Sequence, residues 1–298
     1  MSHSGKPAQL LPVISLLLAA SLWGVFWYPL RLFADYGLTG LWSSLLIYSG
    51  TLPVLVYILY GRMHELARAP GMLFLIALAS GWCNTSFILA MLDGHVVRVL
   101  LLFYLSPVWT VILGFIFLGE RPHRLAVLTI VVAMLGAIIM LWDAKMGVPL
   151  PQTGADWLAL SSGMAFSVTN VAVRHTQAVS VRVKTVMAWV GAVVITGLLL
   201  ATGGQSLVVP SNLVVVMALL FGLVVMVIMT LTVQYGVTHM PAHRSAVILL
   251  FEIVVGAVTA FLLTDELMTK QEWLGGIMVI TAAWLSARLP HEQAREGA

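Results

Sequence analysis

Ten apolar stretches, each about as long as a membrane-spanning helix, make up most of this 298-residue chain. A helix needs roughly 20 apolar residues to cross the hydrocarbon core of a bilayer. Only 9% of the residues are charged, whereas soluble domains carry about 25%. The sequence therefore predicts an all-α integral membrane protein with ten transmembrane helices, over residues 10–30, 41–60, 71–91, 96–118, 124–142, 155–173, 184–202, 212–235, 244–263 and 272–288.

The positions of Lys and Arg predict the orientation of these helices. If the N-terminus is cytoplasmic, eleven of the 15 Lys and Arg residues fall on cytoplasmic segments and four on outer segments. Cytoplasmic loops of membrane proteins carry such an excess. Both termini are therefore expected in the cytoplasm, on a bacterial-type inner (plasma) membrane. The same bias accounts for the basic pI near 9.2, so we expect no nucleic acid as a partner.

The two halves of the chain resemble each other weakly. A shift of 146 residues places Arg98 on Arg244 and Ser106 on Glu252 without a gap, and a shift near 141 places SLWGVFWYPLR on SGMAFSVTNVA. Because each half has an odd number of spans, the two halves must be inverted. Inverted repeats are typical of secondary transporters, whose binding site lies near the bilayer midplane between the halves.

This repeat predicts the organisation of the whole chain. We expect two inverted five-helix repeats joined by an outer linker and flanked by short polar tails. The predicted boundaries are a cytoplasmic N-terminal tail at 1–9, a first repeat at 10–142, the linker at 143–154, a second repeat at 155–289 and a cytoplasmic C-terminal tail at 290–298.

Several motifs resemble those of EamA-type transporters of the drug/metabolite transporter superfamily. They are LSPVWTVILGFIFLGERP (105–122), the Trp23–Gly24 pair and the echo of both in the second half. The resemblance covers essentially the whole chain and implies ten helices in two inverted repeats; many members export amino acids or other small metabolites. The second half of the family commonly reads Leu-Glu-Pro where this chain has Phe251-Glu252-Ile253. The lost proline leaves open whether the helix breaks there.

Glu252 is the one ionisable residue of the oily stretch ILLFEIVVGAVTAFLL (248–263). A charge at the centre of a membrane helix costs roughly 2.5–3.5 kcal/mol on insertion scales, so such residues usually face a cavity or a partner. One interpretation is a structural glutamate that pins the two halves together. The others are a proton-carrying group and a counter-charge for a substrate amine, and the sequence leaves all three open.

Aromatic and amide side chains complete the candidate site. Trp23 and Trp27 lie on one face of a span, and their indole N–H groups need partners that lipid cannot offer; the alternative is tight helix packing. The resemblance implies that the first, third, fourth, sixth, eighth and ninth spans surround a central cavity. The predicted substrate-binding residues are Trp23, Trp27, Trp82, Asn84, Tyr104, Asn170, Gln234 and Glu252. Interhelical hydrogen bonding is the structural alternative for the amides.

Two arginines and three prolines mark further positions. Arg98 and Arg244 each begin a span, where the helix dipole disfavours a cation by about 0.3–1 kcal/mol. Either both reach the lipid headgroups, or each closes one mouth of the cavity by pairing with a carbonyl or carboxylate across it. Prolines interrupt spans because they leave a backbone carbonyl unpaired, and such interruptions are expected at Pro29, Pro53 and Pro107.

The chain has no HExxH, GxSxG or P-loop motif, and Cys83 is its only cysteine. We therefore expect no enzyme activity, no metal site and no cofactor. The predicted function is export of small metabolites, such as amino acids or similar zwitterions, by a monomer using alternating access, with protons as a candidate coupling ion. A carrier of organic cations with an aromatic cage beside Glu252 is the alternative, and a sensor or assembly subunit without flux is a third class.

Overall fold

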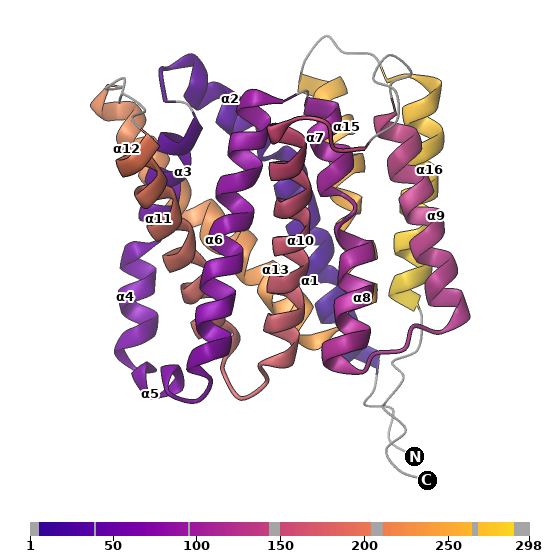
Figure 1. The fold of residues 1–298 in the computed structure, drawn as a ribbon, viewed down its shortest axis with the longest axis horizontal. Coiled ribbons are helices and arrows are strands. Elements are labelled where there is room, and N and C mark those ends of the chain that lie inside the picture. The colour runs from indigo at the N-terminus through magenta and orange to yellow at the C-terminus, as the bar shows by residue number, and fades with distance from the viewer. Residues whose placement is uncertain are drawn as a thin grey trace.

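The computed structural model describes residues 6–38, 40–94, 96–142, 150–203, 211–263 and 268–288. Within these ranges the chain forms a single bundle of helices (Figure 1). Most of the outer linker and of both predicted tails lies outside the described residues. The helices are α1 (Lys6–Val25), α2 (Trp27–Asp35), α3 (Gly40–Ser49), α4 (Leu52–Tyr60), α5 (Met63–Leu66), α6 (Pro70–Asp93), α7 (Val96–Phe103), α8 (Ser106–Leu118), α9 (Arg124–Leu141), α10 (Gly154–His175), α11 (Val181–Gly203), α12 (Asn212–Phe221), the π-helix η2 (Gly222–Met226), α13 (Val227–His239), α14 (Ala242–Leu249), α15 (Phe251–Leu263) and α16 (Lys270–Arg288).

Eight segments of the described chain are long and apolar enough to cross a membrane. They match the first to fifth and the seventh to ninth predicted spans, which confirms an all-α membrane protein. The predicted sixth and tenth spans correspond to α10 and α16. Both are less apolar, since α10 is rich in Ser and Thr and α16 carries charges near both ends. They pack along α6 and α9, respectively. The count of ten spans stays a prediction.

Helix packing repeats when the two halves are exchanged. The first-half helix α6 packs on α10 and α11 of the second half, and its second-half counterparts α13 and α12 pack on α1 and α3 of the first half. In the same way α7 and α8 pack on α10, while α14 and α15 pack on α1. The last helices of the two halves, α9 and α16, pack on each other. The contact pattern is therefore that of two related halves.

The two halves also run in opposite directions. Arg98 near the start of α7 bonds to Asp156 near the start of α10, whereas Arg244 near the start of α14 bonds to the end of α16. The start of α10 and the end of α16 lie at opposite edges of the bundle (Figure 1). Equivalent helices of the two repeats thus begin at opposite edges, as the odd number of spans in each half predicts.

Two matched glycine pairs allow the halves to approach closely. Gly81 packs against Gly191 and Gly50 against Gly222, and the members of one pair lie 141 residues from their counterparts in the other. A Cβ at Gly191 would overlap the carbonyl oxygen of Ala77. Small residues let membrane helices pack backbone to backbone. Glycines occupy both of the equivalent helix crossings.

Replacing Gly191 by alanine should destabilise the protein. The added methyl group would force α6 and α11 apart, which we expect to cost about 1–3 kcal/mol of unfolding free energy. The melting temperature in detergent measures this effect. Gly197→Ala on the same helix is the matched control, because a Cβ there meets no atom within 4 Å. Equal melting temperatures for the two variants would contradict the assigned crossing.

Helix breaks occur where the prolines predict them and at one further place. The first, second and fourth spans are each interrupted two or three residues before Pro29, Pro53 and Pro107, which confirms those expectations. The ninth span also breaks, at Leu250, which the 146-residue shift places on Tyr104. The helix break is therefore present although this chain has Ile253 where the family commonly has a proline.

Local packing accounts for the break at Leu250. The N–H of Ile253 donates to the Leu250 carbonyl, 3.1 Å away, so the chain makes a tight turn before α15. The α1 backbone lies directly against this turn, since a Cβ at Gly24 would lie 2.7 Å from the Glu252 carbonyl oxygen. The close crossing of α1 with α15 thus holds the turn in place of a proline ring.

Candidate functional site

The two equivalent helix breaks bring Tyr104 and Glu252 together. Tyr104 lies in the turn between α7 and α8, and Glu252 lies in the first turn of α15. The Tyr104 hydroxyl interacts with the Glu252 carboxyl group. Tyr104 is buried, whereas Glu252 is partly accessible. The positive end of the α15 dipole favours a negative charge at this position.

Cys83 and Ser162 extend this site from two other helices. The Ser162 hydroxyl on α10 donates to the Cys83 carbonyl oxygen on α6, 2.7 Å away. Cys83 lies within electrostatic range of Glu252. Sequence reasoning did not place either residue in the site, because a lone serine and a lone cysteine in a span carry no distinguishing pattern.

The structure separates the two tryptophans of the first span. Trp27 donates from its indole nitrogen to the hydroxyl of Thr259, 3.1 Å away on α15. Thr259 lies seven residues, or two turns, beyond Glu252 and hence on the same face of that helix. Trp23 instead packs edge-on to Phe26, with ring centroids 5.2 Å apart, in an apolar cluster with α12. Trp27 is thus the member of the pair tied to the helix of Glu252.

Asn84 and Trp82 occupy different surroundings on α6. Asn84 donates to the Tyr48 hydroxyl and accepts from the Ser44 hydroxyl at 3.0 Å, so it joins α6 to α3. Trp82 donates to Ser161 at 3.2 Å and is 37% exposed. Trp82 is therefore an exposed side chain that links α6 to α10.

Asn170 and Gln234 are buried amides with capacity for further hydrogen bonds. They are 3% and 4% exposed, and within the described part of the chain the Asn170 Nδ2 and Gln234 Oε1 atoms have no hydrogen-bond partner. One turn further along each helix, Arg174 donates to the Thr238 carbonyl at 2.8 Å. The two amides therefore lie at a similar depth on α10 and α13, where an unsatisfied polar group costs about 1–3 kcal/mol.

Arg98 joins the two repeats at one edge of the bundle. Its Nε atom lies 2.9 Å from Asp156 Oδ2, and the guanidinium also donates to the Leu150 carbonyl. Arg98 and Asp156 are 7% and 1% exposed. The side chain therefore ends inside the protein and not among lipid headgroups. Asp156 also accepts from two backbone N–H groups and completes the capping box of α10.

Arg244 lies at the opposite edge and has partners of another kind. Its Nε donates to the Ser286 carbonyl at 2.9 Å, and its Nη2 donates to the Ala287 carbonyl at 3.1 Å. These bonds join α14 to the end of α16, and both helices belong to the second repeat. The two arginines are thus equivalent by sequence, but these contacts are not.

Glu120 joins the repeats at the edge where Arg244 lies. Its carboxylate accepts from the backbone N–H of Ala242 at 2.8 Å and lies 3.5 Å from both the Arg174 Nε and the His243 Nδ1. Glu120 follows α8 in the first repeat, whereas its partners belong to the second. The sequence assigned no role to Glu120, which lies within the motif LSPVWTVILGFIFLGERP, because its partners are more than 50 residues away.

Glu65 forms a second link between the repeats at this edge. It accepts from the Ser180 N–H at 2.7 Å and pairs with Arg62 at 2.7 Å. Burial by itself would raise the pKa of Glu65, but the Ser180 hydrogen bonds and the Arg62 charge together lower it from 4.5 to about 2. The carboxylate therefore stays ionised at physiological pH.

This lowered pKa predicts a dependence of stability on pH. A carboxyl group with a depressed folded-state pKa stabilises the protein above pH 4.5, and this contribution is lost as the pH falls toward 2. The contribution is at most about 3 kcal/mol. Glu65→Gln should therefore lower the melting temperature at pH 7, and the difference from the parent protein should shrink below pH 4.5. Glu272→Gln is the control. A melting-temperature difference between Glu65→Gln and the parent protein that stays the same at every pH in this range would contradict the prediction.

Comparisons with known proteins agree with this architecture. The sequence profile of the EamA-like transporter family matches residues 10–142 and 153–288. A segment is 32% identical over 84 residues to Protein RarD of Salmonella typhi, covering 27% of this chain and 29% of RarD. Another is 23% identical over 188 residues to a probable amino-acid metabolite efflux pump of Escherichia coli (strain K12), covering 60% of this chain and 62% of the pump. The chain thus aligns with less than two thirds of either relative.

A solved crystal structure shares the fold. It superposes with a TM-score of 0.74 at 15% identity, over 94% of this chain and 99% of the other. At this identity the likeness concerns the fold alone. The family profile, in contrast, matches most of both repeats. The chain therefore belongs to the EamA-like transporter family of multi-pass membrane proteins.

Proposed function

We propose that this protein is a secondary transporter that exports small zwitterionic metabolites, such as amino acids, across the inner membrane by alternating access. The observation that carries this proposal is the meeting of Tyr104 and Glu252 at equivalent helix breaks of two inverted repeats. Broken helices at the interface of inverted repeats form the binding sites of secondary transporters. We propose that the protein acts as a monomer, with both termini in the cytoplasm.

Glu252 has a role in this scheme that follows from its surroundings. A lone carboxylate within the membrane is costly, so it needs either a proton or a positive partner. The ammonium group of an amino acid is such a partner, and when the cargo leaves, a proton takes its place. We therefore propose that one carboxyl group binds cargo and proton in turn and so couples export to proton entry.

The remaining polar groups favour a zwitterion over an anionic cargo. Asn170 and Gln234 offer uncharged amide groups, whereas the Arg98 guanidinium is engaged with Asp156. A cargo with a net negative charge would need unengaged cationic groups near Glu252. The similar Escherichia coli protein is a probable amino-acid metabolite efflux pump, which also supports this class of cargo.

A carrier of organic cations is the second candidate. Trp27 and Tyr104 both lie close to the helix that carries Glu252, and aromatic faces attract cations. Trp23 packs into a separate apolar cluster, so the cage expected from the sequence would lack one wall. This reduces the support for a quaternary ammonium cargo.

We propose that alternating access uses ionic contacts at the two edges. The Arg98–Asp156 pair would close the outer mouth, because it joins the two repeats. For the inner mouth we propose Glu120, because its contacts with Ala242 and Arg174 join the two repeats. Breaking each contact would accompany opening on that side.

Counterflow in proteoliposomes tests the function. The purified protein is reconstituted with unlabelled leucine, threonine or tetraethylammonium inside, and uptake of the same labelled compound is followed. We expect counterflow for at least one neutral amino acid and none for tetraethylammonium. Counterflow of tetraethylammonium alone would favour the cation carrier. Absence of counterflow across a wider metabolite panel would contradict transport of small metabolites.

A further inference from the structure

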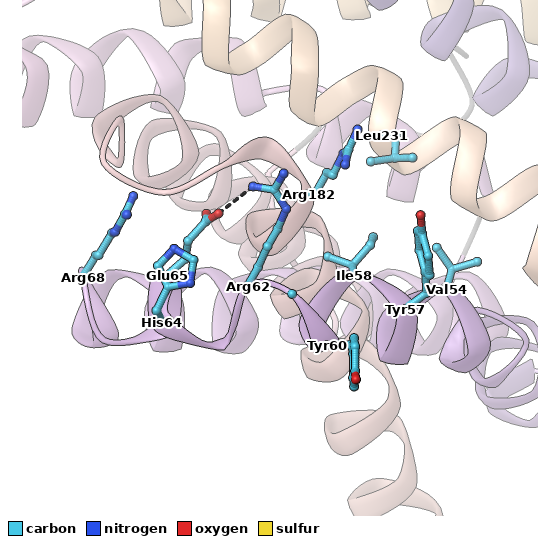
Figure 2. A pocket seen from close by; sticks show the side chains of 11 residues that line it. Val54, Tyr57, Ile58, Tyr60, Arg62, His64, Glu65, Arg68, Arg182 and Leu231 are labelled. Atoms are coloured by element: carbon cyan, nitrogen blue, oxygen red, sulfur yellow. Dashed lines mark hydrogen bonds and ion pairs between the residues drawn. The ribbon is translucent and has the colours of Figure 1, made fainter.

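A cavity of about 880 Å³ is lined by residues at α4, α5, α11 and α13 (Figure 2), and Glu252 is not among its lining residues. Its polar end is formed by residues at and next to α5 together with Arg182 at the start of α11. Its apolar wall is formed by α4 and by Leu231 of α13. The Glu252 site is instead built from α6, α7, α10 and α15. The cavity therefore belongs to a different part of the bundle.

The polar end of this cavity carries an excess of positive charge. Arg62, Arg68 and Arg182 line it with one carboxylate, Glu65. Glu65 pairs with Arg62, and Arg68 donates to the Ala178 carbonyl at 3.2 Å. Figure 2 shows Arg62 and Arg68 extending from the α5 segment toward the side where Arg182 lies. Arg182 is exposed and has no ion pair or hydrogen bond from its side chain within the described ranges.

The apolar wall of the cavity continues into the lipid-facing surface. Val54 and Ile58 of α4 line it together with Leu231, and the neighbouring Tyr57 is 81% exposed. Exposed Val56 on the same helix extends this apolar surface. In a multi-pass membrane protein, such a surface contacts acyl chains. Tyrosines are enriched at the membrane interface, where headgroups meet the hydrocarbon.

We propose that this cavity binds an anionic phospholipid, with its phosphate among the three arginines and its acyl chain along α4. The charge and shape of the cavity match this class of molecule. The anionic headgroup would lie at the cationic end, and the acyl chain would lie against the apolar wall. Basic pockets between membrane helices at the cytoplasmic side bind such headgroups. The assignment to the cytoplasmic leaflet rests on the proposed orientation, whereas the class of lipid does not.

Microscale thermophoresis with a short-chain phospholipid tests this proposal. The purified protein in neutral detergent is titrated with dihexanoyl-phosphatidylglycerol and, separately, with dihexanoyl-phosphatidylcholine. We expect tighter binding of the anionic lipid. Arg182→Gln should weaken that binding about fivefold, the effect of one basic residue near an anionic headgroup. Because the Arg182 side chain makes no contact that holds the fold, the variant should have the parent melting temperature.

Arg121→Gln is the matched control, since Arg121 is an exposed arginine of another predicted cytoplasmic segment. It should leave the affinity for phosphatidylglycerol unchanged. Equal weakening by both substitutions, or equal binding of both lipids, would overturn the proposal. The proposal would also be overturned if millimolar inorganic phosphate competed for the site as effectively as the lipid, because the cavity would then bind a free anion. None of these outcomes depends on whether the protein transports amino acids.

Discussion

Glu252→Gln should leave the protein folded and abolish proton-coupled export. Glutamine keeps the shape of the side chain and can still interact with Tyr104, but it can neither ionise nor pair with an ammonium group. The loss of a hydrogen bond to a charged group, about 1.5–3 kcal/mol, corresponds to roughly 10- to 100-fold weaker binding of cargo. Binding affinity, counterflow and its pH dependence in proteoliposomes measure the effect.

Glu272→Gln is the control for this experiment. Glu272 is a glutamate of the first turn of α16, where it bonds to Thr269 at the edge of the bundle, so its loss should not alter cargo binding. If Glu252→Gln binds and transports normally with an unchanged pH dependence, Glu252 is a structural residue. A larger truncation such as Glu252→Ala would then reduce stability without a specific effect on coupling.

Arg98→Gln should shift the protein toward its outward-open state. The substitution leaves the buried Asp156 without its charged partner, and breaking such a pair costs about 3–5 kcal/mol. Only the state that forms the pair loses this stabilisation, so the ratio of outward-open to outward-closed molecules should rise by about two to four orders of magnitude. Cysteines placed at Tyr104 or Gln234, in a Cys83→Ala background, report the shift by their labelling from each side.

We expect labelling of Tyr104→Cys from the outside to increase and labelling of Gln234→Cys from the inside to decrease. Arg31→Gln is the control, because Arg31 is an exposed arginine predicted on the same side. Unchanged labelling in Arg98→Gln, or a shift in the opposite direction, would exclude the Arg98–Asp156 pair as an outer gate.

Much of the fold follows from local sequence patterns. The apolar stretches predicted eight segments that the structure shows to be long and apolar enough to cross a membrane. The prolines predicted three of the helix breaks. The break at Leu250 was not marked, because backbone packing against Gly24 replaces the proline there. The π-helix at Gly222–Met226 has no signal apart from its glycine, which packs on the backbone of Ile47.

The contact partners of the candidate residues could not be predicted from the sequence. Asn84 was predicted to bind substrate, with interhelical hydrogen bonding as the alternative, and its partners in the structure are Tyr48 and Ser44 on α3. Such pairs depend on how the helices rotate and cross, which a single sequence does not specify. The repeat placed Ser106 on Glu252, but the break beside Glu252 became clear only from the structure.

Proton release on cargo binding tests the central claim most directly. A neutral amino acid that shows counterflow is added to the purified protein in weakly buffered detergent solution near neutral pH, and the pH change is recorded. If Glu252 exchanges a proton for the ammonium group of the cargo, binding should release up to about one proton per bound molecule, and Glu252→Gln should release none. Saturable binding by the parent protein without proton release would contradict the account.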